Sequence, residues 1–74
     1  MLNIGDLVSH NNRTCMSDCM CFFCFPPQNK KMIGIVTTIW IDEDDHQASI
    51  VEFPVGEAVF REDSYKKLNI LSNL

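Results

Sequence analysis

The chain has few basic residues and few glycines and prolines. Its 74 residues include three glycines, three prolines, one tryptophan and six lysines or arginines, against ten aspartates or glutamates. It contains no glycine-rich phosphate loop, and no serine, histidine and acid are placed as a catalytic triad. The net charge of −4 opposes non-specific nucleic-acid binding, which needs a basic face to displace counterions. We therefore expect neither an enzyme with a small-molecule substrate nor a protein that binds nucleic acid.

Long apolar runs are also missing. No segment approaches the roughly 20 apolar residues that span a membrane. The start, MLNIGDLVSH, lacks the basic region and apolar core of a signal peptide. The sequence therefore predicts one cytoplasmic domain over residues 1–74, with no membrane partner. A chain of this length buries only about 60% of its unfolded surface, so a metal, a crosslink or a partner is expected to add stability.

Short segments rich in β-branched residues make up most of what is present. The clearest is 32–41, whose valine, isoleucines and threonines favour a pleated strand over a helix. Other predicted elements are strands at Leu7–His10, 48–53, 58–61 and 68–71, a polar hairpin tip at 42–47, a turn at 54–57 and a single helical turn at 62–65. Five short strands with a helical turn before the last predict an all-β fold, a small closed barrel without exposed edges.

Residues 11–31 form the long first loop of this predicted barrel. They show no sustained period of two or of 3.6, and they hold all four cysteines, three phenylalanines and a Pro-Pro pair. Some twenty residues without a regular pattern are unusual in so small a domain, and long loops of this kind are commonly functional. The loop is therefore the first place to look for a binding site.

The order of these segments resembles a known group of small barrels. The matching motifs are GDLV at 5–8, GIV at 34–36, IVEF at 50–53 and YKKLNIL at 65–71. They look like those of a Src-homology-3-like barrel, an arrangement shared by KOW-type and Tudor-type domains and by short bacteriophage proteins. The resemblance covers most of the chain and implies a barrel that binds a protein or a nucleic acid. Residues 15–27 depart from the group, in which a plain polar loop is more usual.

The cysteines cluster within ten residues, at Cys15, Cys19, Cys21 and Cys24. Four thiolates could complete a tetrahedral zinc site, and His10 could replace one sulfur. An iron–sulfur cluster would need the same thiolates, but C-x3-C-x-C-x2-C is not a recognised ferredoxin spacing. A disulfide such as Cys15–Cys24 or Cys19–Cys24 would require an oxidising setting, whereas reduced cysteines can pack as small apolar side chains. The spacing leaves these alternatives open.

Four aromatic residues are candidate partner contacts. Phe22, Phe23 and Phe25 adjoin the cysteines, and three rings within four residues are hard to bury together in so small a domain. We expect at least one of them to cap the barrel and the others to face a partner. Trp40 is a second candidate, because it lies on the face of its strand opposite the isoleucines. The acidic run at 42–45 lacks the alternating ligands of a calcium loop and is interpreted as a solvated hairpin tip.

Taken together, the patterns predict a non-enzymatic structural or interaction protein. It would dock on another protein, or assemble with itself, through the Cys/Phe loop and Trp40. The resemblance to phage proteins gives a concrete form, a small virion component such as a decoration, cement or connector subunit. Two alternatives remain open, a KOW-type module acting on nucleic acid or on the transcription and translation machinery, and a zinc-binding or redox-responsive adaptor.

Overall fold

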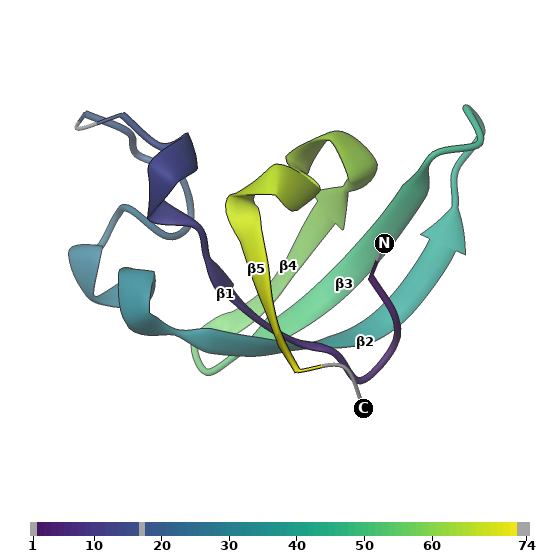
Figure 1. The fold of residues 1–74 in the computed structure, drawn as a ribbon, viewed down its shortest axis with the longest axis horizontal. Coiled ribbons are helices and arrows are strands. Elements are labelled where there is room, and N and C mark those ends of the chain that lie inside the picture. Colours follow the sequence, from purple (N-terminus) through teal and green to yellow (C-terminus); the bar gives the residue numbers. More distant parts are fainter. Residues whose placement is uncertain (1, 17, 73–74) are drawn as a thin grey trace.

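The computed structural model describes residues 2–16 and 18–72, and in this part of the chain five strands form one antiparallel sheet (Figure 1). The order of the strands across the sheet is β4-β3-β2-β1-β5. The elements are β1 (Leu7–His10), η1 (Asn12–Thr14), η2 (Pro27–Lys31), β2 (Ile33–Ile41), β3 (Gln47–Phe53), β4 (Gly56–Arg61), η3 (Glu62–Lys67) and β5 (Leu68–Ser72), where η marks a 3-10 helix. No described helix is both long and apolar enough to cross a membrane.

The predicted all-β fold is confirmed. Every expected strand is present, and the helical turn expected before the last strand is η3, which runs two residues further than predicted. The buried hydroxyl of Ser49 on β3 is hydrogen-bonded to the Tyr65 hydroxyl, and this bond ties η3 to the sheet. In Figure 1 the sheet is strongly curved, and the chain from η3 into β5 crosses in front of it. The arrangement is that of a small barrel-like fold.

The side chains that β2 turns toward the core change along the strand, because its pairing with β3 is irregular. Gly34 and Val36 point into the core, while Ile33 and Ile35 are exposed. The register then shifts between Val36 and Thr38, so β2 has one more residue than β3 at this point, as in a β-bulge. Ile39 can therefore pack against the core although it shares the alternation of the outward isoleucines. The alternation of side chains in the sequence alone does not show that Ile39 faces the core.

The core contains a side chain from the long first loop. The buried cluster consists of residues from the sheet, the N-terminal segment and the loop, namely Leu2, Val8, Phe23, Val36, Val51, Phe53, Phe60 and Leu68. Phe23 is 1% exposed, and its ring lies 5.3 Å from that of Phe53 and 5.8 Å from that of Phe60. One turn of the loop is thereby fixed against the sheet.

Gly34 provides the space that the Phe53 ring occupies. A Cβ atom at this position would lie 2.6 Å from both Phe53 Cε1 and Val51 Cγ1. We expect Gly34→Ala to lower the free energy of unfolding by about 1–3 kcal/mol, because overpacking forces these side chains to move. The outward Ile33→Ala is the control and should cost less than about 1 kcal/mol. Urea denaturation of both variants tests this, and equal midpoints would contradict it.

Candidate metal centre

His10 ends β1 with its side chain on the inner face of the sheet. Val8 and His10 are both buried, as the alternation of the strand requires. The His10 ring stacks on Phe23, with ring centroids 4.5 Å apart and planes inclined by 14°. Its Nε2 lies 3.2 Å from Cys15 Sγ. The core aromatic ring thus orients an imidazole nitrogen toward the cysteine loop.

Three cysteines converge on this nitrogen. Cys15 Sγ lies 3.8 Å from Cys21 Sγ, and Cys21 Sγ lies 3.6 Å from Cys24 Sγ. The ligand atoms of His10 and of these three cysteines all lie within 4.8 Å of one another. The four thiols of the chain are free in the structure, so each of these sulfurs is available as a donor. The group could hold a metal ion.

The spacing of the donors fits a tetrahedral ion. With Zn–S bonds of about 2.3 Å, a regular tetrahedron places its sulfurs about 3.8 Å apart. A Zn–N bond of about 2.05 Å gives a nitrogen-to-sulfur separation of about 3.55 Å. The observed 3.8, 3.6 and 3.2 Å are within a few tenths of an ångström of these values. The other three separations are at most 4.8 Å, so one ion could contact all four donors if the side chains moved closer around it.

Cys19 stands apart from this set. It does not belong to the group of donors within 4.8 Å of one another, which takes His10 in its place. Its thiol is nevertheless near enough to affect the pKa values of Cys15, Cys21 and Cys24 by hydrogen bonding. The sequence prediction of a site with His10 as the substitute ligand therefore describes the observed grouping better than the set of four cysteines.

A tight turn presents Cys21 and Cys24 on the same side. The Cys24 N–H donates to the Cys21 carbonyl at 3.0 Å, and the Phe25 N–H donates to the same oxygen at 3.1 Å. The turn is held from outside by Asn29, a buried residue of η2 whose Nδ2 donates to the Phe22 carbonyl at 2.9 Å. The buried role of Asn29 was not predicted, because a polar residue shortly after Pro-Pro is typical of an exposed loop.

The environments of the thiols differ, and so do their pKa values. Burial raises the pKa of Cys15, and burial together with hydrogen bonding to Cys21 raises the pKa of Cys24 to about 12. Burial also acts to raise the pKa of Cys21, but hydrogen bonds from the backbone N–H groups of Phe23 and Cys24 outweigh it, and the pKa falls to about 7. A cation must therefore displace protons from Cys15 and Cys24 when it binds.

This difference predicts selective labelling of the metal-free protein. The lowered pKa makes Cys21 the more readily ionised of the two thiols near neutral pH, whereas Cys24 stays protonated and buried. Because only the thiolate is alkylated, iodoacetamide should modify Cys21 more than about tenfold faster than Cys24. Peptide mass spectrometry over a time course measures both rates. Equal rates would contradict the prediction, and protection of Cys21 by added zinc would link it to the metal site.

The predicted aromatic contacts divide into buried and exposed residues. Phe23 belongs to the core and is withdrawn from the candidate contact surface, in line with the expectation that at least one ring caps the barrel. Phe25 is 63% exposed, and Phe22 is partly exposed with its ring 5.3 Å from that of Phe53. Trp40 is 39% exposed and lies near the end of β2, where it lines a depression together with residues of the hairpin tip. The candidate contacts therefore do not form one site.

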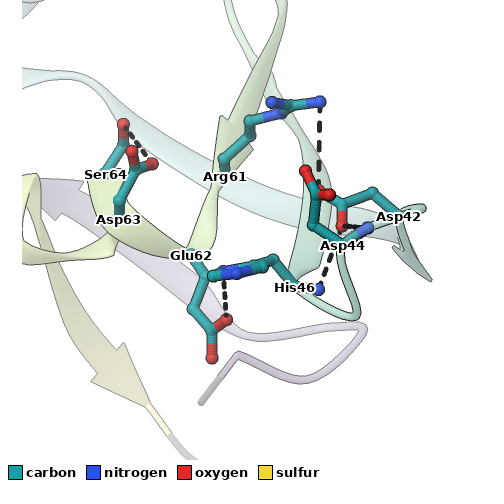
Figure 2. Close-up of polar contacts among 7 residues, drawn as sticks. All are labelled: Asp42, Asp44, His46, Arg61, Glu62, Asp63 and Ser64. Atoms are coloured by element: carbon teal, nitrogen blue, oxygen red, sulfur yellow. Dashed lines mark hydrogen bonds and ion pairs between the residues drawn. The ribbon is translucent and has the colours of Figure 1, made fainter.

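The acidic run forms the β2–β3 hairpin tip (Figure 2). Backbone hydrogen bonds from His46 and Asp44 to Asp42 Oδ1, each 3.0 Å long, hold the pKa of Asp42 below its usual value. Arg61 lies 3.9 Å from the same carboxylate, and His46 lies 3.3 Å from Glu62. These contacts enclose a shallow depression of about 190 Å³ and stabilise a turn.

Comparison with known proteins gives no match to a family model, to a curated protein or to a solved structure.

Proposed function

We propose that the chain is a non-enzymatic interaction protein whose Cys/Phe loop is held by a structural zinc ion and docks on another protein. The observation that carries this proposal is the convergence of the His10 nitrogen with the sulfurs of Cys15, Cys21 and Cys24 within 4.8 Å. These donors come from the end of β1 and from the loop, so one ion would join the loop to the sheet. Small domains commonly gain part of their stability from such an ion.

The chemistry of the donors favours zinc. Three thiolates and one imidazole form a set typical of structural zinc sites, which are closed by four protein ligands. Iron–sulfur clusters are more often held by four thiolates, and an oxygen-preferring ion such as calcium or magnesium finds no carboxylate among the four donors. With all four positions filled by the protein, the ion would have no open position for a substrate or a reactive water. Its role would therefore be structural.

The surface near the site supports docking. Met16, Met20 and Phe25 are 79%, 73% and 63% exposed, all within one ten-residue segment of the loop. Methionine and phenylalanine side chains are common at protein interfaces, where their apolar area leaves water. A metal that fixes the loop would limit the conformational entropy lost when this surface binds. We therefore expect the partner to contact the loop rather than the acidic hairpin tip.

The fold is consistent with this role. The strand order β4-β3-β2-β1-β5, with a 3-10 helix before the last strand, supports the Src-homology-3-like interpretation of the sequence. The virion role stays a prediction of the phage resemblance, and copurification of the chain with particles tests it. The nucleic-acid role also stays a prediction, and titration with RNA and DNA at low ionic strength tests it.

Two measurements test the proposal. Elemental analysis of protein purified without chelator should give one zinc per chain, and a folded, zinc-free protein with four titratable thiols would contradict the metal part. For docking, the chain is immobilised and partners are captured from its source cells, with Phe25→Ser as the test variant and Val59→Ser as a control that is equally exposed on β4. Capture should fail with Phe25→Ser alone, and equal capture by both variants would contradict docking through the loop.

A further inference from the structure

Two of the candidate ligands lie at the two ends of one turn. Cys21 and Cys24 are three positions apart, the Cys24 N–H donates to the Cys21 carbonyl at 3.0 Å, and their sulfurs are 3.6 Å apart. A turn of this kind keeps its first and fourth Cα atoms within about 7 Å. A disulfide needs a Cα separation of about 4.4–6.8 Å. The native backbone therefore already holds these two thiols within reach of a disulfide.

We propose that a hydroperoxide converts the zinc-bound loop into a Cys21–Cys24 disulfide and releases the ion, an inference that rests on the zinc site proposed above. Of the two thiols, Cys21 is half-buried and can be reached from solvent, whereas Cys24 is buried. Cys21 is therefore the sulfur that meets the peroxide, and Cys24 is the resolving thiol.

The chemical steps balance. The Cys21 thiolate attacks one oxygen of hydrogen peroxide, the O–O bond breaks, and hydroxide leaves as Cys21 becomes a sulfenic acid. The Cys24 thiolate then attacks the Cys21 sulfur, the S–O bond breaks, and a second hydroxide leaves as the disulfide forms. Zinc binding has already displaced the protons of these ligands, so the two hydroxides take two protons from the solvent. Two thiolates, one peroxide and two protons thus give one disulfide and two waters. The bonds that zinc would make to Cys21 and Cys24 break as these sulfurs are oxidised. Both electrons come from sulfur, and zinc departs with its charge unchanged.

The release would act on one part of the loop. Phe23 lies between the two cysteines and remains in the core, so the oxidised turn keeps its place. The segment before it is held differently. Asn11 is anchored to η3, because its N–H donates to the Lys67 carbonyl and its Nδ2 to the Lys66 carbonyl. Further along, the N–H groups of Thr14 and Cys19 donate to the nearby carbonyls of Asn11 and Met16. Loss of the ion removes the link from Cys15 to the sheet. Oxidation would therefore loosen the segment that carries the exposed methionines, and docking would weaken.

One digest identifies the oxidised pair. Zinc-loaded protein is treated with one equivalent of hydrogen peroxide, released zinc is followed with a chromogenic chelator, and remaining thiols are blocked with iodoacetamide. After denaturation trypsin cuts at Arg13 and Lys30, so one peptide of residues 14–30 holds all four cysteines. We expect loss of the bound zinc, alkylation of Cys15 and Cys19, and a mass lowered by two hydrogens at Cys21 and Cys24.

Limited trypsin treatment of the native protein should cut at Arg13 at least about tenfold faster after oxidation.

Cys19→Ser is the matched control, because it removes the thiol outside the four-donor set. This variant should bind zinc, release it with peroxide and form the same disulfide. Retention of zinc after the peroxide is consumed, or a disulfide that includes Cys15 or Cys19, would overturn the inference and leave the zinc site standing. A protein that holds no zinc before oxidation would instead contradict the proposed function itself.

Discussion

Replacing Phe23 by alanine is expected to remove most of the stability of the domain. The ring is 1% exposed and contacts aromatic rings of His10, Phe53 and Phe60. Truncation of a buried phenylalanine costs about 3–5 kcal/mol, since the transfer energy is lost and a cavity remains. Domains of this size are stable by only a few kcal/mol. Urea denaturation followed by the fluorescence of the one tryptophan should give a transition near zero denaturant.

Phe25→Ala is the control for this experiment. The residue is the same, it lies two positions further along the same loop, and it is 63% exposed. Its truncation should change the free energy of unfolding by less than about 0.5 kcal/mol. If both variants were equally stable, Phe23 would not belong to the core, and the loop would not be fixed to the sheet by this ring.

Removal of the proposed zinc ion is expected to have the second large effect. At a zinc concentration about 1,000 times the dissociation constant, binding to the folded state alone adds about 4 kcal/mol. For a domain of this size that corresponds to a fall in the melting temperature of roughly 15–30 °C on adding excess chelator. Calorimetry with and without chelator, and again after zinc is restored, measures the change. A melting temperature that does not respond to either reagent would contradict the metal centre.

Zinc binding by two serine variants tests which cysteines are ligands of the proposed metal site. Cys21→Ser removes a donor that lies 3.8 and 3.6 Å from the sulfurs of Cys15 and Cys24, and it should abolish stoichiometric zinc binding. Cys19→Ser leaves the four-donor set complete and should retain one zinc per chain. The absorption of a cobalt-substituted sample gives an independent measure, because it reports the number of thiolate ligands. Loss of the metal in both variants would indicate a site of four cysteines instead.

His10 and Phe23 connect these two predictions. The imidazole that would bind zinc is stacked on the ring that fills the core, at 4.5 Å and nearly parallel to it. A core that loses Phe23 therefore also loses the support that orients the His10 donor. We expect Phe23→Ala to bind zinc more weakly, whereas chelation should leave Phe23 in the core.

The strands were predictable because each repeats a local signal. β2 is rich in β-branched residues, and polar or proline-containing segments separate the strands. The irregularity between Val36 and Thr38 was not predictable, since it depends on how β2 meets its partner strand. The buried role of Asn29 was hidden for the same reason, as its hydrogen bond to Phe22 joins two parts of the loop that no sequence period relates.

The all-β class, the place of the loop and the short list of possible metal ligands could be predicted from the chain alone, because they depend on composition and local order. Which of these residues meet depends on the folded molecule. It brought His10 from the end of β1 to Cys15, Cys21 and Cys24, and left Cys19 outside that group. It also placed Phe23 inside and Phe25 outside. The physical reason is that the curvature of the sheet and the packing of one ring set distances between residues far apart in the chain, and sequence spacing does not contain those distances.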